Sequence, residues 1–375
     1  MKALYTYLRE HPVAYITRHK ERADGIPEDT PGYRIVAEPS KSTREQIKDL
    51  ENPNNESLLL FKPNRQVETI CKQNRWNLLN PSADLAERVE AKISQTRWLS
   101  DLARYLPSFA IRTCKELRFD GEPIIVQFNH SHSGLGTILL DSNEKLEYLM
   151  SNFPDRPVRI TRFVKGPMIT SNNIVAGERV LLGSISYQIT GLPAFTDNPF
   201  ATVGNDWGLG TKLATGRIRD DFNEIVHAVG KRLSREGWRG CYGVDAIIEE
   251  GTNKIYLIEI NARQTASVSF ESQIQKSLSI SGVTSFEAHF TALLNLPFGE
   301  DLIPITFGSR LIRRVMQTPM SGTAIAKVKE LGLDTVEFPK DELGEDLLHI
   351  RSMNASFMQE HGKLSDLGER IVAIL

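Results

Sequence analysis

Cysteine is scarce in this sequence of 375 residues, which contains only Cys71, Cys114 and Cys241. The three lie far apart and form no CxxC pair, so neither a disulfide framework nor a cysteine-rich zinc site is expected. Buried thiols in a reducing compartment account best for this usage.

Long apolar runs are also missing. The N-terminal segment mixes charges with short apolar runs and lacks the continuous apolar stretch of a signal peptide, and no run could cross a bilayer. Neither sign of charge is in excess, because 45 lysines and arginines face 47 acidic residues, for a net charge of -2. This balance argues against a nucleic-acid partner. We therefore expect a cytoplasmic protein that binds neither membrane nor nucleic acid.

The patterns that are present indicate an α/β chain, long enough for two or three compact units. Short apolar runs at 13–17 and 58–61 are typical of buried strands, and a helical pattern follows at 65–76. This strand–loop–helix unit predicts an open-sheet domain over roughly the first eighty to ninety residues. Further along, the chain alternates helical and strand-like patterns. We expect helices at 85–106, 143–152 and 221–236, and strands at 124–128, 158–164 and 178–190.

Two strand-like runs on either side of Thr252 predict a hairpin. Asp245 and Glu259 are equally distant from Thr252, so they should lie directly opposite each other. Side chains alternate along a strand, and cross-strand neighbours share a face. Asn261 and Arg263 should therefore lie on the same face as the two acids.

This face has the chemistry of a magnesium-phosphate site. The two acids and the amide offer hard oxygen ligands for Mg²⁺, and the arginine can neutralise charge on a phosphoryl group. The alternative is a solvent-facing strand pair with incidental ion pairs. Ile247 and Leu257, expected on the same face, make that alternative the less favoured one.

A glycine-rich segment follows the predicted strand at 124–128. Ser133, Gly134, Leu135 and Gly136 offer unhindered backbone N–H groups that suit phosphate oxygens, although a tight turn has the same composition. The neighbouring His130 and His132 read better as polar loop residues than as metal ligands, because no further ligand is evident. A second glycine cluster carries Trp207 and Lys212, which would meet a second substrate or lie in a surface loop.

The run IEINAR at 258–263, with an acid fourteen positions upstream, resembles the metal-binding core of the ATP-grasp superfamily. That superfamily includes D-alanine–D-alanine ligase, biotin carboxylase and enzymes that join amino acids into dipeptides. The similarity runs from Lys92 to Arg263, with its elements in the family's order. It implies that Lys92 binds phosphate, that the glycine-rich loop covers the phosphates, and that backbone groups of Phe163 and Val164 bind the adenine edge.

Three positions depart from the family's pattern. Gln127 stands where many members have a second lysine, and Thr161 and Met168 stand where glutamates are common. Gln127 can donate a hydrogen bond to a phosphate but brings no charge, so replacing it with lysine is expected to tighten ATP binding. Asn172 or Asn173 could supply a ribose contact in place of the glutamate.

The resemblance implies four units. An N-terminal open-sheet (pre-ATP-grasp) domain at 1–90 precedes a two-subdomain ATP-grasp fold with mixed and antiparallel sheets. The small subdomain is expected at 91–165, the large subdomain with the metal core at 166–300, and a C-terminal appendage, to which we attach no chemistry, at 301–375.

The implied activity is that of an ATP-dependent carboxylate–amine ligase that works through an acyl phosphate and releases ADP and phosphate. ATP and Mg²⁺, or Mn²⁺ in its place, would be the cofactors, held by Asp245, Glu259 and Asn261, with Arg263 and Lys92 as catalytic residues. The substrates would be small carboxylates and amines, with amino acids favoured, and a homodimer is left open. Two alternatives stand beside this reading: a carboxylase-like enzyme, and a catalytically silent nucleotide-binding module.

Overall fold

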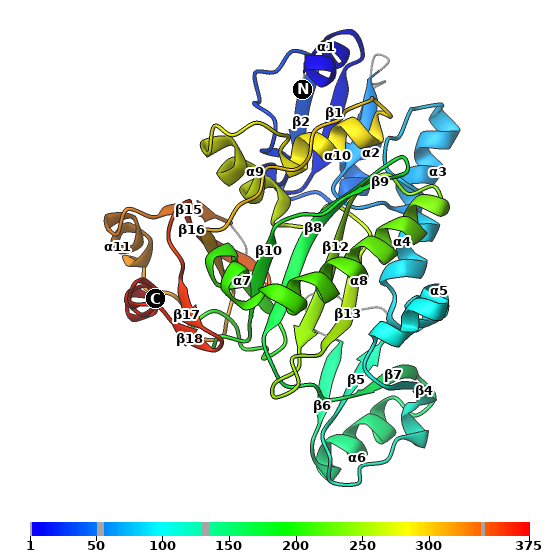
Figure 1. Ribbon diagram of the computed structural model, residues 1–375, viewed down its shortest axis with the longest axis vertical. Helices are drawn as coiled ribbons and strands as arrows, with labels where there is room; N and C mark the ends of the chain where they lie inside the picture. Colours follow the sequence, from blue (N-terminus) through cyan, green and yellow to red (C-terminus); the bar gives the residue numbers. More distant parts are fainter. Residues whose placement is uncertain (1, 51–55, 130–135, 339–341) are drawn as a thin grey trace.

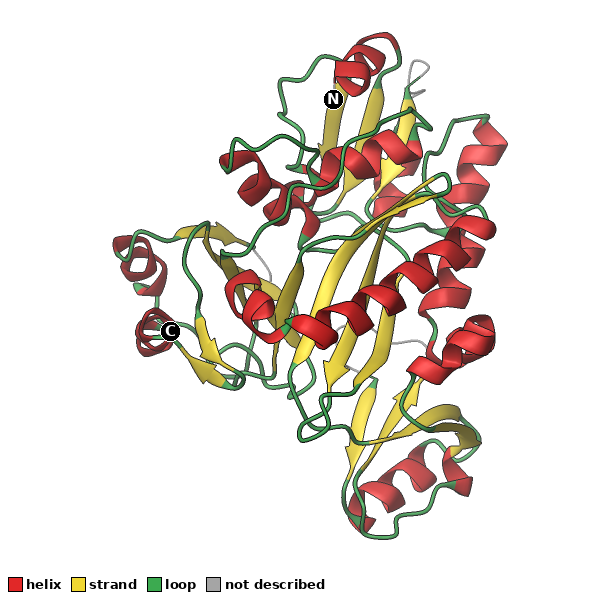
Figure 2. Ribbon diagram, viewed as in Figure 1, coloured by secondary structure: helices red, strands yellow, loops and turns green. Residues whose placement is uncertain are grey.

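The computed structural model describes residues 2–50, 56–129, 136–338 and 342–375. The described residues form four sheets. In Figures 1 and 2 an N-terminal sheet lies at the top of the view, a small sheet at the bottom, and a large sheet runs between them and into the C-terminal region on the left, where β17 (Met358–Glu360) and β18 (Lys363–Leu364) form a fourth, two-stranded sheet. Among the helices of the described ranges, none combines the length and the apolar character that a membrane span requires.

The N-terminal sheet is parallel, with strand order β2-β1-β3. The predicted strand at 13–17 is confirmed, and the one predicted at 58–61 begins and ends one residue earlier. Its strands are β1 (Val13–Thr17), β2 (Tyr33–Ala37) and β3 (Ser57–Leu60), and its helices are α1 (Lys2–Glu10), α2 (Thr43–Asp49) and α3 (Arg65–Asn74). Capping by Ser42 and Asn64 starts α2 and α3.

The two faces of this sheet belong to different cores because β1 alternates its side chains. Ala14 and Ile16 pack with residues of α2 and α3. Val13 and Tyr15 pack instead with residues of α10 (Ser285–Leu293), more than two hundred positions away in the chain. The N-terminal sheet therefore shares one of its cores with a helix of the segment expected as the large subdomain.

The prediction of a single helix at 85–106 is wrong. The segment forms three helices, namely α4 (Ala83–Glu90), α5 (Lys92–Leu99) and the 3₁₀ helix η2 (Ser100–Tyr105). The first break is at Ala91, whose backbone is extended. Asn129 starts the new helix from outside, since its carbonyl and side-chain oxygens accept the N–H groups of Lys92 and Ile93 at 3.1 and 2.9 Å. Hydrophobic periodicity does not report a cap supplied by a distant residue.

The small sheet is antiparallel, with strand order β4-β7-β5-β6. The strand at 124–128 and the helix at 143–152 match the prediction, and the strand predicted at 158–164 ends two residues earlier. The elements are β4 (Phe109–Thr113), the 3₁₀ helix η3 (Cys114–Glu116), β5 (Ile124–Phe128), β6 (Thr137–Leu140), α6 (Asn143–Asn152) and β7 (Pro157–Arg162). One face packs on α6, and the other turns toward the large sheet.

The large sheet has nine strands in the order β13-β12-β8-β10-β11-β14-β16-β15, with β9 paired to β8. Its strands before the C-terminal region are β8 (Met168–Ala176), β9 (Arg179–Leu181), β10 (Ile185–Thr190), β11 (Thr202–Asp206), β12 (Gly240–Ile248) and β13 (Ile255–Asn261). Strand β8 was not predicted. The strand predicted at 178–190 is two strands, and the break between them contains Gly183, where a Cβ would lie 1.9 Å from the carbonyl oxygen of Asn172.

Helices cover the large sheet. Helix α8 (Gly216–Arg235) crosses β8, β12 and β13 in Figure 1 and shares a core with them, and it begins five residues before the predicted helix. The short α7 (Trp207–Leu213) precedes it. Helices α9 (Val268–Ser277) and α10 lie between the large sheet and the N-terminal sheet.

The segment expected as a C-terminal appendage is continuous with the large sheet. Strand β14 pairs with β11 and with β16, which in turn pairs with β15. The elements of this segment are β14 (Ser309–Arg314), α11 (Ala324–Glu330), β15 (Asp334–Glu337), β16 (Asp346–Ser352), β17 (Met358–Glu360), β18 (Lys363–Leu364) and α12 (Asp366–Ile374). The last seventy-five residues thus extend the surface that carries the predicted site.

Candidate active site

The predicted hairpin is formed by β12 and β13. Asp245 lies opposite Glu259, as the spacing about Thr252 predicts, and Asn261 lies opposite Gly243 on the same face. Asp245 and Asn261 are both buried, with 8% of each side chain exposed. The geometric core of the expected metal site is therefore present.

A bulge at Ile258 interrupts the hairpin. Asp245 pairs with Glu259, but the next residue, Ala246, pairs with Leu257. The extra residue breaks the alternation of side chains, so Leu257 turns to the opposite face and packs in the core beneath α8. The expectation that Leu257 lines the site is wrong. Ile258 takes its place on the site face, beside Ile247.

The Asp245 carboxylate is held by two side chains. Thr170 of β8 donates a hydrogen bond from its hydroxyl to Oδ1 at 2.5 Å, and Asn261 donates its amide to Oδ2 at 3.2 Å. Burial and the nearby charge of Glu259 raise the pKa of Asp245 to about 6. Because Asn261 uses its NH₂ group in this bond, its side-chain carbonyl remains an acceptor.

Lys92 forms an ion pair with Glu259, with 3.1 Å between Nζ and Oε1. The lysine opens α5 under the cap of Asn129, and only 4% of the residue is exposed. Burial lowers the pKa of Lys92, although the charge of Glu259 opposes this effect. Burial alone would raise the pKa of Glu259, but the charges of Lys92 and Arg263 outweigh it and the pKa is lowered. The predicted phosphate-binding lysine and metal-binding glutamate are thus immediate neighbours.

Arg263 lies just beyond the end of β13 and is paired with Glu90. Glu90 is the last residue of α4 and also binds Lys62, which follows β3, at 2.7 Å. The charges of Arg263 and Lys62 overcome the effect of burial and lower the pKa of Glu90. Sequence reasoning missed Glu90, because its helical pattern carries no sign that its carboxylate contacts both Lys62 and Arg263.

Gln127 of β5 lies between Arg159 of β7 and Thr137 of β6 in the register of the small sheet. Arg159 donates to Oε1 of Gln127 from Nε at 3.0 Å and from Nη2 at 2.7 Å. The Gln127 amide donates to the Thr137 hydroxyl at 3.4 Å. Sequence reasoning missed Arg159 as well, although strand alternation at 157–162 places it opposite the buried face of Val158 and Ile160.

The expected adenine-binding segment lies against the hairpin. Val164 packs on Ile247 and Tyr256, and Phe163 is 38% exposed. The carbonyl of Lys165 accepts the N–H of Glu250 at 2.9 Å. The connection between the small and large sheets is therefore anchored at the turn of the predicted metal hairpin.

Part of the glycine-rich loop lies outside the described residues, namely His130, His132, Ser133, Gly134 and Leu135. Gly136 is described, and its carbonyl accepts the N–H of Phe128 at 3.0 Å. The structure therefore places the end of this loop directly beside β5.

Three other candidate residues are enclosed by protein. Trp207 is buried against Phe270 and Ile274, whereas Lys212 is exposed. The two readings of their segment, a substrate contact and a surface loop, meet a strand and a helix here, since 202–213 forms β11 and α7. Asn172 binds Thr265, Ser267 and Glu271, and Asn173 binds Ser171 and the N–H of Gly183. These partners occupy the amides that were considered for a ribose.

Two further arginines flank the segment that follows Arg263. The Arg22 guanidinium lies 4.0 Å from the centroid of the Phe61 ring. The backbone carbonyl of Arg22 accepts a hydrogen bond from the Gln264 side-chain amide at 2.7 Å. Arg310 of β14, 5% exposed, donates to Asn205 at 3.0 Å and to the Ala266 carbonyl at 2.8 Å. Within the described part of the chain, neither guanidinium forms an ion pair with a carboxylate. Burial lowers the pKa of Arg310 to about 10, although the charge of Asp346 opposes this effect.

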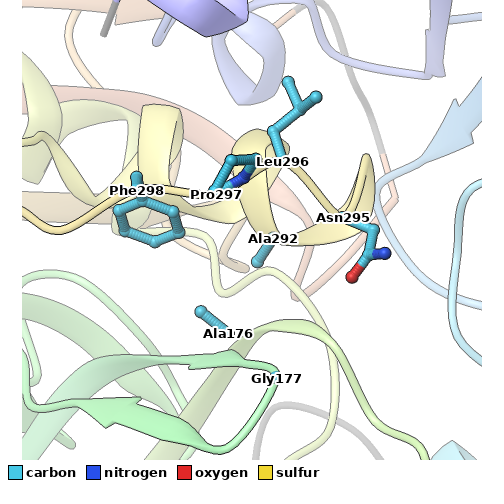
Figure 3. Close-up of a pocket in the computed structure, with 7 residues that line it drawn as sticks. All are labelled: Ala176, Gly177, Ala292, Asn295, Leu296, Pro297 and Phe298. Atoms are coloured by element: carbon cyan, nitrogen blue, oxygen red, sulfur yellow. The ribbon is translucent and has the colours of Figure 1, made fainter.

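A cavity of about 390 Å³ adjoins the carboxylates. Its wall is formed by 62–66 after β3, by α4, and by Asn129 and Glu259. Open α/β sheets bind ligands outside the carboxyl ends of their strands, and β3 ends at this cavity. A second cavity, of about 280 Å³, lies between the β8–β9 turn and the end of α10 (Figure 3). No residue of the predicted site lines the second cavity.

The donor set fits Mg²⁺. Mg²⁺ in proteins is held by one or two carboxylates, and water and substrate phosphates complete the octahedron. Asp245, Glu259 and the Asn261 carbonyl meet this need. In the described ranges, no cluster of three or more His, Cys, Asp or Glu side chains suits a metal that requires a full protein cage.

Comparison with known proteins connects this geometry to a family. Residues 89–267 match the family described as the ATP-grasp domain. The arginine-specific large chain of carbamoyl phosphate synthase from Bacillus subtilis is 21% identical over 156 residues, which are 41% of this chain and 14% of that protein. The chain thus spans only a small part of that relative's length.

Solved structures are similar over almost the whole chain. Carboxyaminoimidazole ribonucleotide synthase from Aspergillus clavatus, complexed with ATP, superposes with a TM-score of 0.68 at 13% identity, covering 97% of this chain and 99% of that one. L-amino acid ligase from Bacillus licheniformis has a TM-score of 0.63 at 15% identity, covering 93% and 94%. At these identities the similarity establishes the fold, including the N-terminal sheet and the C-terminal strands.

Proposed function

The chain belongs to the ATP-grasp superfamily through residues 89–267, and from this we propose that it is an ATP-dependent ligase that joins a carboxylate to an amine. A substrate carboxylate attacks the γ-phosphate to give an acyl phosphate and ADP, and the amine then displaces phosphate. The observation that carries the proposal is the arrangement of Asp245, Glu259 and Asn261 on one face, with the Lys92 ammonium 3.1 Å from Glu259.

The roles of the residues follow from their positions. Asp245, Glu259 and Asn261 would hold Mg²⁺, which when bound supplies positive charge beside the phosphates and orients them. Lys92 binds a phosphate, and Arg263 stabilises charge on the transferring group. Because phosphoryl transfer requires little covalent chemistry from the protein, catalysis rests on placing and neutralising these groups.

The basic groups around the segment 264–269 support an anionic substrate. Arg310 is buried and Arg22 is partly buried. Arg22 contacts this segment through its backbone carbonyl and Arg310 through its guanidinium, and among the described residues neither side chain forms an ion pair with a carboxylate. Arginine binds carboxylates through paired N–H donors, and burial strengthens that interaction. We assign these two guanidinium groups to the carboxylate substrate, and the cavity beside Lys62 and Glu90 to the amine.

Two alternatives are set against this function. A silent nucleotide-binding module would explain the lack of a lysine at Gln127. Such a module has no need of the carboxylates of Asp245 and Glu259 facing each other on one side of the hairpin. A carboxylase-like enzyme would phosphorylate bicarbonate, and the relative from Bacillus subtilis named as a carbamoyl phosphate synthase gives this reading its support. Bicarbonate is therefore included among the carboxylates to be tested.

The test is product analysis with the full chain, MgATP and a panel of carboxylates, bicarbonate and amines. We expect ADP and phosphate in amounts that depend on an added acid, and no AMP or pyrophosphate. Release of AMP and pyrophosphate would contradict the acyl phosphate. If ATP binds but no pair of substrates yields ADP above the level of the Glu259→Gln variant, the silent module is the better description.

A further inference from the structure

Arg159 carries a buried charge that the chain does not neutralise. Only 2% of the residue is exposed, and its four hydrogen bonds go to neutral acceptors. These are Gln127 Oε1 (twice), Gln95 Oε1 at 3.1 Å and the Ile258 carbonyl at 3.3 Å. Within the described ranges no carboxylate lies at ion-pair distance from it. A buried guanidinium without a counter-ion is costly, so its position needs an explanation.

Its location is the junction of the predicted nucleotide site. Gln95 belongs to α5, the helix that Lys92 opens, and Gln127 belongs to β5, the strand before the glycine-rich loop. Ile258 is the bulged residue of β13, next to Glu259. Arg159 therefore contacts all three elements that surround the expected phosphates. Among the described carboxylates, Glu259 influences the pKa of Arg159, and Glu259 already pairs with Lys92.

The hydrogen bonds of Arg159 also fix the orientation of Gln127. A glutamine side chain has an oxygen at one corner and an NH₂ group at the other. Because two donors of Arg159 hold the oxygen, the NH₂ group must turn away from it. It points toward Thr137, the first residue of β6, which directly follows the glycine-rich segment. The contact with the Thr137 hydroxyl is long, at 3.4 Å, so this donor can be shared with a ligand at little cost.

We propose that Arg159 and Gln127 form a joint phosphate-binding unit, in which the Gln127 amide donates to a nucleotide phosphate and Arg159 orients that amide and supplies the positive charge. The inference rests on the proposed nucleotide site between the two sheets. Arg159 is a positioning residue in this unit, since it acts through Gln127 and through its charge. The positive charge absent from position 127 is then present on the neighbouring strand.

This arrangement reverses an expectation from the sequence. A lysine at 127 should tighten ATP binding if the site merely lacks a charge. In the structure the ammonium of such a lysine would stand beside the Arg159 guanidinium in a buried place, and like charges repel strongly where water is excluded. The Gln127→Lys variant should therefore bind ATP more weakly than the wild type. Removing the guanidinium at the same time should restore binding.

The experiment measures equilibrium binding of ATP, ADP and AMP, each with Mg²⁺, to the full chain and four variants. Arg159→Gln should weaken ATP binding about tenfold, as expected for a lost charge-assisted hydrogen bond. It should weaken AMP binding less than about twofold. Gln127→Lys should also weaken ATP. The double variant Gln127→Lys/Arg159→Gln should return to within about threefold of the wild type. Arg112→Gln, on the exposed side of the same sheet, is the control and should change nothing.

Thermal unfolding checks that each variant is folded. If the Arg159→Gln variant does not fold, Arg159→Lys takes its place. This variant keeps the charge but loses the paired contact with Gln127, so it should weaken ATP binding by less than tenfold. The inference is overturned if ATP and AMP weaken by the same factor, or if the double variant binds ATP no better than the weaker single variant. A wild type that binds no ATP overturns the proposed function, and this inference with it.

Discussion

Lys92 and Glu259 form an ion pair between helix α5 and the large sheet, with 3.1 Å between the ammonium and the carboxylate. One comes from the first residue of α5 and the other from the edge strand of the large sheet. In the proposed enzyme both must turn to a new partner when the nucleotide binds, the lysine to a phosphate and the glutamate to Mg²⁺. Each member of the pair favours the charged form of the other.

Changing Glu259 tests this relationship. Glu259→Gln removes a proposed metal ligand and the partner of Lys92. We expect the loss of several kcal/mol of transition-state stabilisation, so turnover should fall about a thousandfold or more. The fold should persist, because the amide has the same shape. Steady-state ADP formation and thermal unfolding measure the two effects. Glu250→Gln, at the exposed turn of the same hairpin, is the matched control; if it lost as much activity, the role of Glu259 would be refuted.

Replacing Arg22 tests the assignment of the acid substrate. Arg22→Gln should raise the KM for the carboxylate about tenfold, because a charge-assisted hydrogen bond is lost. The affinity for ATP should stay within about twofold, since Arg22 lies at the N-terminal sheet and not at the small sheet. The nearby exposed Arg18→Gln should change neither value. Equal losses for the acid and for ATP would show that Arg22 supports the whole site and not one substrate.

The buried Glu271 predicts a pH dependence of stability. Its carboxylate accepts hydrogen bonds from Asn172 and Ser285, and burial raises its pKa to about 7 from 4.5. Between these two values the folded chain holds a proton that the unfolded chain has lost, so stability falls as pH rises and levels off above pH 7. A shift of this size corresponds to about 3 kcal/mol.

The Glu271→Gln variant isolates this effect because it cannot titrate. We expect the free energy of unfolding of the wild type, relative to that of the variant, to fall by up to about 3 kcal/mol between pH 5 and pH 8. Chemical unfolding at several pH values measures the difference. The exposed Glu178→Gln should follow the wild type. Parallel curves for wild type and Glu271→Gln would rule out an abnormal pKa at this residue.

The core shared by the N-terminal sheet and α10 predicts a large loss at Phe286. Its ring stacks on Phe290 at 5.2 Å and on Tyr15 of β1 at 6.1 Å between centroids, and it is fully buried. Phe286→Ala should cost about 3–5 kcal/mol of stability, measured by chemical unfolding. Ile280→Ala, which is 52% exposed, should cost less than about 0.5 kcal/mol. A small loss at Phe286 would mean that the two units fold independently.

Local patterns in the sequence predicted the parts of the site that depend on local geometry. The opposition of Asp245 and Glu259 follows from spacing about a turn, and the structure has it. The bulge at Ile258 could not be read in this way, because an extra residue in a strand depends on what the strand packs against. Leu257 was placed on the wrong face for that reason.

The remaining errors concern contacts between distant segments. The break at Ala91 depends on Asn129, and the orientation of Gln127 depends on Arg159, which is thirty-two positions later. Glu90 forms ion pairs with both Lys62 and Arg263, and Arg263 lies at the far end of the predicted ATP-grasp segment. Propensity and periodicity act over a few residues, so they carry no information about such partners.

The division of the N-terminal sheet between two cores also sets an order of events during synthesis. The face formed by Ala14 and Ile16 can close as soon as α2 and α3 have been made. The face formed by Val13 and Tyr15 packs in part on Leu4 and Leu8 of α1, but it is completed only when α10 has been made. At roughly 5–20 residues per second on the ribosome, that wait is on the order of 10–40 seconds. Throughout this interval part of the apolar face of β1 stays uncovered in the nascent chain, because the α10 residues that complete its core have not yet been made.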